Sequence, residues 1–265
     1  MSRVAAGLSL VTGGAASARP KSSPGFLEEG DHPQHGGGVG HAFPRPLNHS
    51  KSGPPPLQMQ GRILLPAPPS PTLSELFAAH PRDGGWTGFL LAQVDTSKPW
   101  LWVQDRMAIL ESGRIHPPGL PTPSLIHVET RDARDALWAM EEGVRCSALS
   151  CVIGEIWGDP RALDFTATRR LAVAAERSGV PCWLVRLAGS ANLGGARMRW
   201  RVASAPSLLN PFDARAPGSS AWDADLFRAR GSPPGRWTIA YEADRFHLVA
   251  ASGDRTLGEI ERLSA

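Results

Sequence analysis

The fold is decided by residues 147–187, which begin with SALSCVIGEIW (147–157) and end with VPCWLVRL (180–187). Both runs are short, apolar and rich in β-branched or aromatic residues, which predicts two buried strands. Neither run alternates cleanly between apolar and polar residues, so the sheet should be covered on both faces. The segment between them is long enough for a helix, and we therefore predict a βαβ unit with parallel strands.

The helix of this unit has clear start and stop signals. Asp164 or Thr166 can cap its first turn, Gly179 follows its last turn, and Pro181 prevents its continuation. The apolar residues recur at i, i+4, i+7 and i+8 and form one stripe: Ala167, Leu171, Ala174 and Ala175. This stripe should pack on the sheet, with the charged residues toward water.

Composition separates a polar N-terminal segment from a globular remainder. Residues 1–60 are rich in Gly, Pro, Ser and His and lack apolar periodicity, which predicts a disordered tail. We divide the rest into an α/β core at 61–205 and a C-terminal, partner-binding extension at 206–265. The formal net charge is +3, and the tail accounts for two of these charges, so the remainder is nearly neutral.

The cysteines and the hydropathy indicate a cytoplasmic protein outside the membrane. No stretch is long and apolar enough to cross a bilayer. The three cysteines lack the spacing of metal ligands, and an odd number without that spacing is typical of reduced thiols that pack in a core: Cys146, Cys151 and Cys182. We expect no metal and no disulfide.

Patterns on either side of the βαβ unit extend it into a mostly parallel sheet flanked by helices. Three further runs have strand character: 99–105, 124–129 and 197–202. Residues 131–144 have the period of an amphipathic helix. Near the C-terminus, residues 236–241 and 245–250 predict an antiparallel hairpin.

Four other segments have weaker signals. A short helix is expected at 72–80, where Thr72 and Glu75 have capping-box spacing, and a second short helix should end at 89–92. Four prolines and two glycines predict that residues 106–123 are mostly loop. Residues 222–231 are expected to hold one helical turn.

The order of elements from 125 to 202 resembles the core of RecA-type recombinases. Five segments are more specifically similar to the ImuA family: LWVQD (101–105), GEIWGDP (154–160), LDFTATRRLA (163–172), ERSGVP (176–181) and RWRV (199–202). That family comprises RecA-related bacterial proteins that act with the polymerase-like protein ImuB and an error-prone replicative-type polymerase in damage-induced mutagenesis. The resemblance covers about residues 72–240 and implies a RecA-like α/β fold.

RecA-type ATP hydrolysis requires a Gly-rich loop that ends in Gly-Lys-Ser/Thr, because its backbone amides and lysine hold the phosphates. This chain has no such motif, and its three lysines lie elsewhere: Lys21, Lys51 and Lys98. GGWTG (84–88) is expected at the place of the loop, but it offers no cation and carries the bulky Trp86. Glu155 resembles the acid that holds the magnesium water, and without phosphates a structural role is expected for it. We predict a degenerate domain that is not an enzyme and binds no cofactor.

A basic strand is the first candidate binding surface. Arg197, Arg199 and Arg201 alternate with apolar residues and should form its outer face. Three like charges on one face require something anionic nearby: DNA phosphate, an acidic protein partner, or carboxylates of this same fold. The preceding loop, 188–195, matches a DNA-contacting loop of RecA-type proteins but contains no Lys or Arg.

Aromatic residues in the C-terminal third are the second candidate surface. Three of them are interleaved with charged residues: Trp222, Phe227 and Trp237. Aromatic residues among arginines are frequent anchors of protein interfaces. They equally suit a second role, which is to cover part of the sheet within this chain.

Three functions remain open from the sequence. The first is a non-catalytic adaptor in SOS-induced translesion DNA synthesis, with an ImuB-like protein and an error-prone polymerase as partners, and with RecA and weakly held single-stranded DNA as further candidate contacts. The second is a divergent RecA-like ATPase that uses Glu155 with an unconventional loop. The third is a cell-division inhibitor similar to the SulA family. The ImuA resemblance favours the first.

Overall fold

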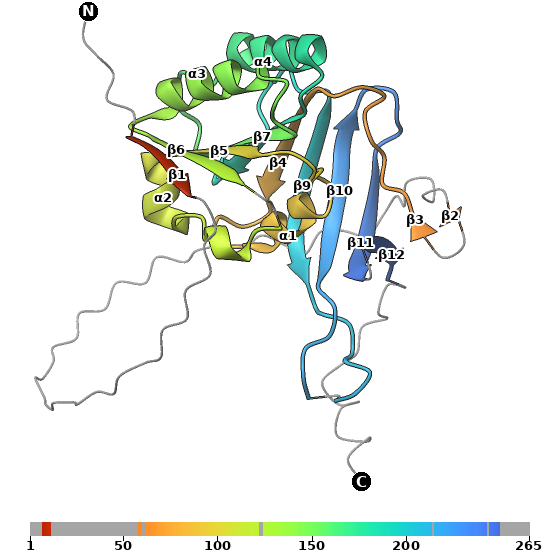
Figure 1. Ribbon diagram of the computed structural model, residues 1–265. Coiled ribbons are helices and arrows are strands. Elements are labelled where there is room, and N and C mark those ends of the chain that lie inside the picture. Colours follow the sequence, from red (N-terminus) through yellow and green to blue (C-terminus); the bar gives the residue numbers. More distant parts are fainter. Residues whose placement is uncertain are drawn as a thin grey trace, which may run out of the picture. The chain divides into compact units, whose positions relative to one another are not determined.

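The computed structural model describes residues 7–11, 58–59, 62–121, 124–213, 215–242 and 244–249. Its strands form one 12-stranded sheet in the order β1-β6-β5-β7-β8-β4-β9-β10-β11-β12-β3-β2 (Figure 1). The central six are parallel: β6 (Leu125–Thr130), β5 (Trp100–Asp105), β7 (Cys151–Trp157), β8 (Cys182–Leu187), β4 (Leu73–Ala78) and β9 (Met198–Ala205). Together with the C-terminal hairpin, this parallel core confirms the predicted α/β fold class.

Antiparallel strands extend the core on both sides. On one side lie β10 (Ala221–Ala229), β11 (Gly235–Glu242), β12 (Arg245–Leu248), β3 (Arg62–Ile63) and β2 (Gln58–Met59). The predicted hairpin is confirmed as β11 and β12. β9 pairs with β10, so a single sheet contains strands from both sides of the boundary that we placed between residues 205 and 206. On the other side, β1 (Gly7–Val11) pairs with β6. Residues 7–11 and 58–59 of the predicted tail thus form β1 and β2, and its other residues lie outside those that the structure describes.

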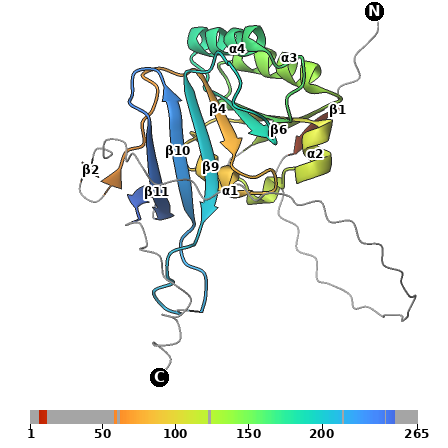
Figure 2. The same cartoon turned by 180° about the vertical axis from the view of Figure 1, so that it is seen from behind.

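The helices lie on the two faces of the sheet (Figure 2). α3 (Ala133–Val144) and α4 (Phe165–Ser178) pack on one face, while α1 (Gly85–Leu91) and α2 (Arg106–Ser112) pack on the other; Pro117–Gly119 forms a short 3-10 turn. None of the helices in this described part is long and apolar enough to cross a membrane.

The predicted start and stop signals of α4 are confirmed. The Asp164 carboxylate accepts a hydrogen bond from the backbone N–H of Ala167 at 2.7 Å, which caps the first turn. Gly179 ends the helix in the left-handed conformation, with φ of 73°. Both ends of α4 are therefore capped. The helix connects β7 to β8, which pairs with β7 in parallel.

Two apolar clusters fill the space between the sheet and the helices. The cluster on the α1 face contains seven of the nine tryptophans: Trp86, Trp100, Trp102, Trp183, Trp200, Trp222 and Trp237. The cluster on the α3 and α4 face is mainly aliphatic. The abundance of tryptophan is therefore explained largely by the core of this chain.

The helix predicted at 72–80 is wrong, because these residues form the central strand β4. β4 is covered on both faces, and its large apolar residues Leu73, Leu76 and Phe77 have the i, i+3 and i+4 spacing of a helix face. A short apolar run of this kind does not distinguish a buried strand from a helix. Glu75, which had the spacing of a capping residue, is instead a buried member of the strand.

Two other local predictions need correction. Residues 106–112 form α2 and not loop, because the four prolines of that segment all follow position 116 and the Asp105 carboxylate caps the helix by accepting from the Ala108 N–H at 2.6 Å. Residues 221–229 form β10 and not a helical turn. Alternate residues of β10 face the core, and those between them face away.

Candidate functional site

β4, the loop after it and α1 have the strand–loop–helix arrangement in which phosphate-binding loops occur. The sequence placed GGWTG (84–88) in that loop, but Gly84 is the N-cap residue of α1 and residues 85–88 already belong to the helix. The loop is held by Asp83, whose carboxylate accepts hydrogen bonds from the backbone N–H of Gly85 at 2.9 Å and of Ser204 at 2.7 Å. A carboxylate thus lies in this loop, and the negative charge of Asp83 would repel a phosphate group.

A pocket of about 410 Å³ lies between this loop and the carboxyl ends of β5 and β7. Trp86 and Trp102 line it, with their ring centroids 6.5 Å apart, and Trp86 is only 6% exposed. The pocket also contains Arg82 and Arg114 on its wall. Two indole rings therefore take up space beside the loop, in place of the ammonium group that a triphosphate requires.

Glu155 lies at the base of this pocket and is 3% exposed. Its two carboxylate oxygens accept hydrogen bonds from Trp102 Nε1 at 2.5 Å and from Gln104 Nε2 at 3.0 Å. Burial raises the pKa of Glu155 to about 7, and the nearby Asp105 carboxylate adds to this rise, while the two hydrogen bonds oppose it. Both carboxylate oxygens of Glu155 thus have hydrogen-bond donors within this chain.

Gln104 connects Glu155 to His127 on the neighbouring strand. The Gln104 carbonyl oxygen lies 3.1 Å from His127 Nε2 and accepts from the Ile115 N–H at 3.2 Å. In this arrangement His127 Nε2 carries the proton, and burial lowers the pKa of His127. His127 is therefore a hydrogen-bonded core residue, consistent with its place on a buried strand.

The raised pKa of Glu155 should make stability depend on pH. The folded state keeps the proton up to about pH 7, whereas an unfolded glutamate releases it near pH 4.5. The stabilising effect is therefore complete below pH 4.5 and is lost as pH rises through 7, and the shift corresponds to about 3 kcal/mol. Urea unfolding at several pH values should show a fall across this window that Glu155→Gln removes, whatever the variant's absolute stability. Equal slopes for the two proteins would contradict the assignment.

Arg197, which precedes β9, and Arg199 and Arg201 within β9 do not form the basic outer face that the sequence predicted. Arg199 is 3% exposed, and each of the three arginines lies beside a carboxylate of this chain. The pairs are Arg197 with Glu176 (2.6 Å), Arg199 with Glu75 (2.6 Å) and Arg201 with Asp225 (3.9 Å). Of the three anions considered for this face, carboxylates of the same fold are the ones observed.

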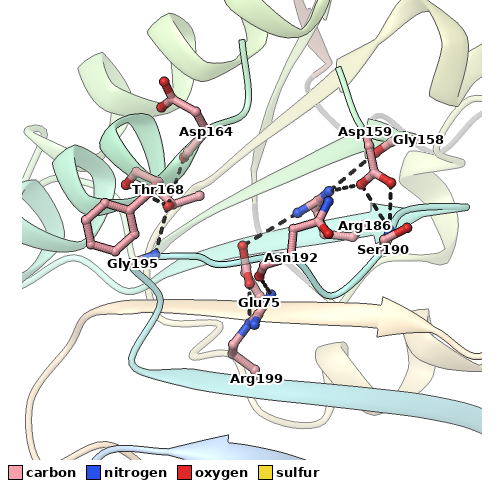
Figure 3. A network of polar contacts seen from close by, with 11 residues as sticks. Glu75, Gly158, Asp159, Asp164, Thr168, Arg186, Ser190, Asn192, Gly195 and Arg199 are labelled. Atoms are coloured by element: carbon pink, nitrogen blue, oxygen red, sulfur yellow. Dashed lines mark hydrogen bonds and ion pairs between the residues drawn. The ribbon is translucent and has the colours of Figure 1, made fainter. Parts of the chain in front are cut away.

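Arg199 belongs to a network that we call the buried charge network (Figure 3). Glu75, Arg186 and Arg199 are buried, and the exposed Asp159 completes the network by pairing with Arg186. Glu75 is fully buried in β4; its carboxylate accepts from Arg199 Nε and lies 3.8 Å from Arg186 Nη1. Arg186 also donates to Asp159 at 2.5 Å. The Phe77 ring lies against both guanidinium groups, 5.5 Å from that of Arg186 and 5.2 Å from that of Arg199. One buried carboxylate thus serves two buried cations.

The loop between β8 and β9, residues 188–195, is fastened over this network (Figure 3). The Ser190 N–H donates to the Asp159 carboxylate at 2.9 Å, and the Asn192 carbonyl accepts from Arg199 Nη2 at 2.8 Å. At the end of the loop, the Gly195 N–H donates to the Thr168 hydroxyl of α4 at 2.8 Å. These contacts fix the loop to the fold at three places.

Trp222 and Trp237, two of the predicted partner anchors, are buried in the core of this chain. They are 5% and 7% exposed. Trp222 lies 6.4 Å from Phe89 of α1, and Trp237 lies 6.1 Å from Trp200, measured between ring centroids. Both side chains therefore cover the sheet within this chain and do not form an exposed surface.

Phe227, the third predicted anchor, lies on the opposite face of β10 and is half-buried. The guanidinium groups of Arg199 and Arg201 lie over its ring at 5.3 and 5.1 Å from the centroid. Such cation–π contacts stabilise the arginines of β9 in addition to their carboxylate partners. Phe227 thus belongs to the surroundings of the buried charge network.

Comparison with known proteins finds relatives of this chain by sequence similarity. No family model matches the chain. The chain is 31% identical over 176 residues to Protein ImuA of Caulobacter vibrioides, and the aligned part covers 61% of this chain and 70% of that protein. Protein ImuA of a second strain of the same species matches equally well.

Proposed function

Because the chain belongs to the ImuA family, we propose that it is a non-catalytic accessory factor in damage-induced, error-prone DNA synthesis. In this role it acts in the cytoplasm as an adaptor for an ImuB-like protein and an error-prone polymerase. RecA and single-stranded DNA are further candidate contacts. The partners come from the family resemblance, whereas the lack of catalysis is argued from the residues at the loop after β4.

The observation that carries the proposal is the chemistry of that loop. Asp83 provides an anion where phosphate-binding loops provide backbone amides and a lysine, and Trp86 fills part of the adjoining pocket. The Glu155 carboxylate already accepts hydrogen bonds from the side chains of Trp102 and Gln104. These features favour a domain that works by contact with other macromolecules over the alternative of a divergent ATPase.

We expect purified protein to release no phosphate from ATP in the presence of magnesium. The rate should equal that of a matched blank, and it should be the same for Glu155→Gln. The loop supplies no lysine to stabilise the transferred phosphoryl group, and the fork-shaped guanidinium of Arg82 is a poor replacement for it. Phosphate release and calorimetric titration of ATP with magnesium measure turnover and binding separately. ATP turnover that Glu155→Gln abolishes would establish the ATPase alternative instead.

Co-purification tests the adaptor role directly. Tagged full-length protein should retain an ImuB-like protein of the same organism, under conditions in which the tubulin-like division protein is washed away. Retention of the division protein alone would favour the alternative similar to SulA. Retention of neither protein would refute the adaptor role.

A further inference from the structure

α3 and α4 lie side by side on one face of the sheet (Figures 1 and 2). Residues of both helices line a groove of about 470 Å³. Val173 and Ala174 contribute the apolar part of its lining. The charged residues of the lining are four arginines and one glutamate: Arg145, Arg169, Arg170, Arg177 and Glu141. This groove is separate from the pocket beside Glu155.

The positive charge of the groove is only partly compensated. Glu141 contacts Arg170 and also Arg145, the latter at 2.6 Å, and Glu142 pairs with Arg145 as well, so these two guanidinium groups are compensated by two carboxylates. Arg169 and Arg177 are exposed and form no ion pair or side-chain hydrogen bond with any residue in the part of the chain that is described. Two cations beside an apolar lining are therefore available to an anionic ligand.

Two exposed aromatic side chains accompany these arginines. Trp138 of α3 is 60% exposed and precedes Arg145 by seven residues, which places it on the same face of the helix. Phe165 at the start of α4 is 40% exposed and precedes Arg169 by four residues. Exposed aromatics beside arginines are the residues most enriched among interface anchors. Unlike Trp222 and Trp237, these side chains are not used by the core.

A protein segment suits this groove better than nucleic acid does. Binding to a phosphate backbone requires a row of cations and is typical of strongly basic domains, whereas this chain carries a net charge of only +3. The arginines here surround Val173 and Ala174. A ligand that fits must bring carboxylates for the arginines and apolar side chains for the floor, which is the pattern of an acidic amphipathic helix.

We propose that the groove between α3 and α4 binds an acidic amphipathic segment of a partner protein. Carboxylates of that segment pair with Arg169 and Arg177, and an apolar side chain packs on Val173. The inference rests on the proposed adaptor function for the existence of such a partner, and it assigns the surface and the chemistry of the contact.

The test uses full-length protein and a fluorescent peptide in which Glu and Leu repeat with helical spacing. Binding, followed by fluorescence anisotropy, should weaken with salt. Arg169→Glu with Arg177→Glu should weaken it at least about tenfold, because attraction becomes repulsion. The matched control is Arg106→Glu with Arg228→Glu, which changes two exposed arginines on α2 and β10 and should alter binding less than about twofold. A peptide with Ala for Leu should also bind at least about tenfold more weakly.

Several results would overturn the inference. The first is that the Glu and Leu peptide shows no saturable binding. The second is that the control variant weakens peptide binding as much as the groove variant does. The third is that oligothymidine binds more tightly than the peptide and that the groove variant abolishes this binding. Circular dichroism of each variant shows whether it is folded.

Wild-type protein and the groove variant are also both tested for co-purification with the ImuB-like protein. If wild-type protein retains the ImuB-like protein but does not bind the peptide, the groove inference fails alone. If wild-type protein binds the peptide but does not retain the ImuB-like protein, the adaptor role fails alone.

Discussion

Glu75→Ala should lower the free energy of unfolding by about 3–5 kcal/mol, because it leaves the buried Arg199 guanidinium without its carboxylate and leaves Arg186 with the exposed Asp159 alone. Glu75 is fully buried and accepts from Arg199 at 2.6 Å, while Arg186 lies 3.8 Å away. After the substitution Arg199 keeps only the Asn192 carbonyl as a hydrogen-bond acceptor. Urea unfolding measures the loss, and the midpoint should fall with little change in slope.

A surface pair provides the matched control for this substitution. Arg201 lies 3.9 Å from Asp225 and its side chain is 38% exposed, so Arg201→Ala should cost less than about 1 kcal/mol. Glu75→Gln should fall between the two, since it keeps an acceptor and loses the charge. A loss from Glu75→Ala no larger than that from Arg201→Ala would show that the network is open to water.

The second large effect is expected for Gly195→Ala. A Cβ atom at position 195 would lie 2.5 Å from the backbone nitrogen of Arg169 and 2.6 Å from its Cα. These atoms belong to α4 and cannot rotate away, so the loop must move and lose its hydrogen bond to Thr168. We expect a destabilisation of about 1–3 kcal/mol. Hydrogen exchange should show faster exchange at the Gly195 amide.

Gly84→Ala is the control for Gly195→Ala. A Cβ atom at Gly84 would meet nothing within 4 Å, and the φ angle of −82° suits any residue. Its effect on stability should therefore stay within about 0.5 kcal/mol. Similar losses from the two substitutions would mean that the loop does not pack on α4 as described.

The βαβ unit could be predicted because its signals are local. Asp164 and Gly179 mark the ends of α4 within the sequence of the helix itself. The buried charge network could not be predicted in this way, since Glu75 and Arg199 are 124 residues apart and only the parallel pairing of β4 with β9 brings them together. A signal existed: a lone carboxylate between Leu73 and Leu76 implies a buried partner.

The candidate surfaces show the same difference between local and non-local information. The alternation at Arg199 correctly placed the arginines on one face of a strand, but it could not show which elements cover that face. Trp222 lies in a polar stretch of sequence, which gave no sign of its neighbour Phe89 on α1. For Glu155, resemblance indicated the position, while its hydrogen bonds to Trp102 and Gln104 required the structure.

The pairing of β1 with β6 has a consequence for the solution behaviour of shortened forms. β1 runs antiparallel along β6 from Gly7 to Val11 and satisfies backbone groups that would otherwise face water. A form that lacks residues 1–13 would present the amides and carbonyls of β6 as a template for a foreign strand. Shortening the chain at this end would then promote self-association, even though the enclosed core remained intact.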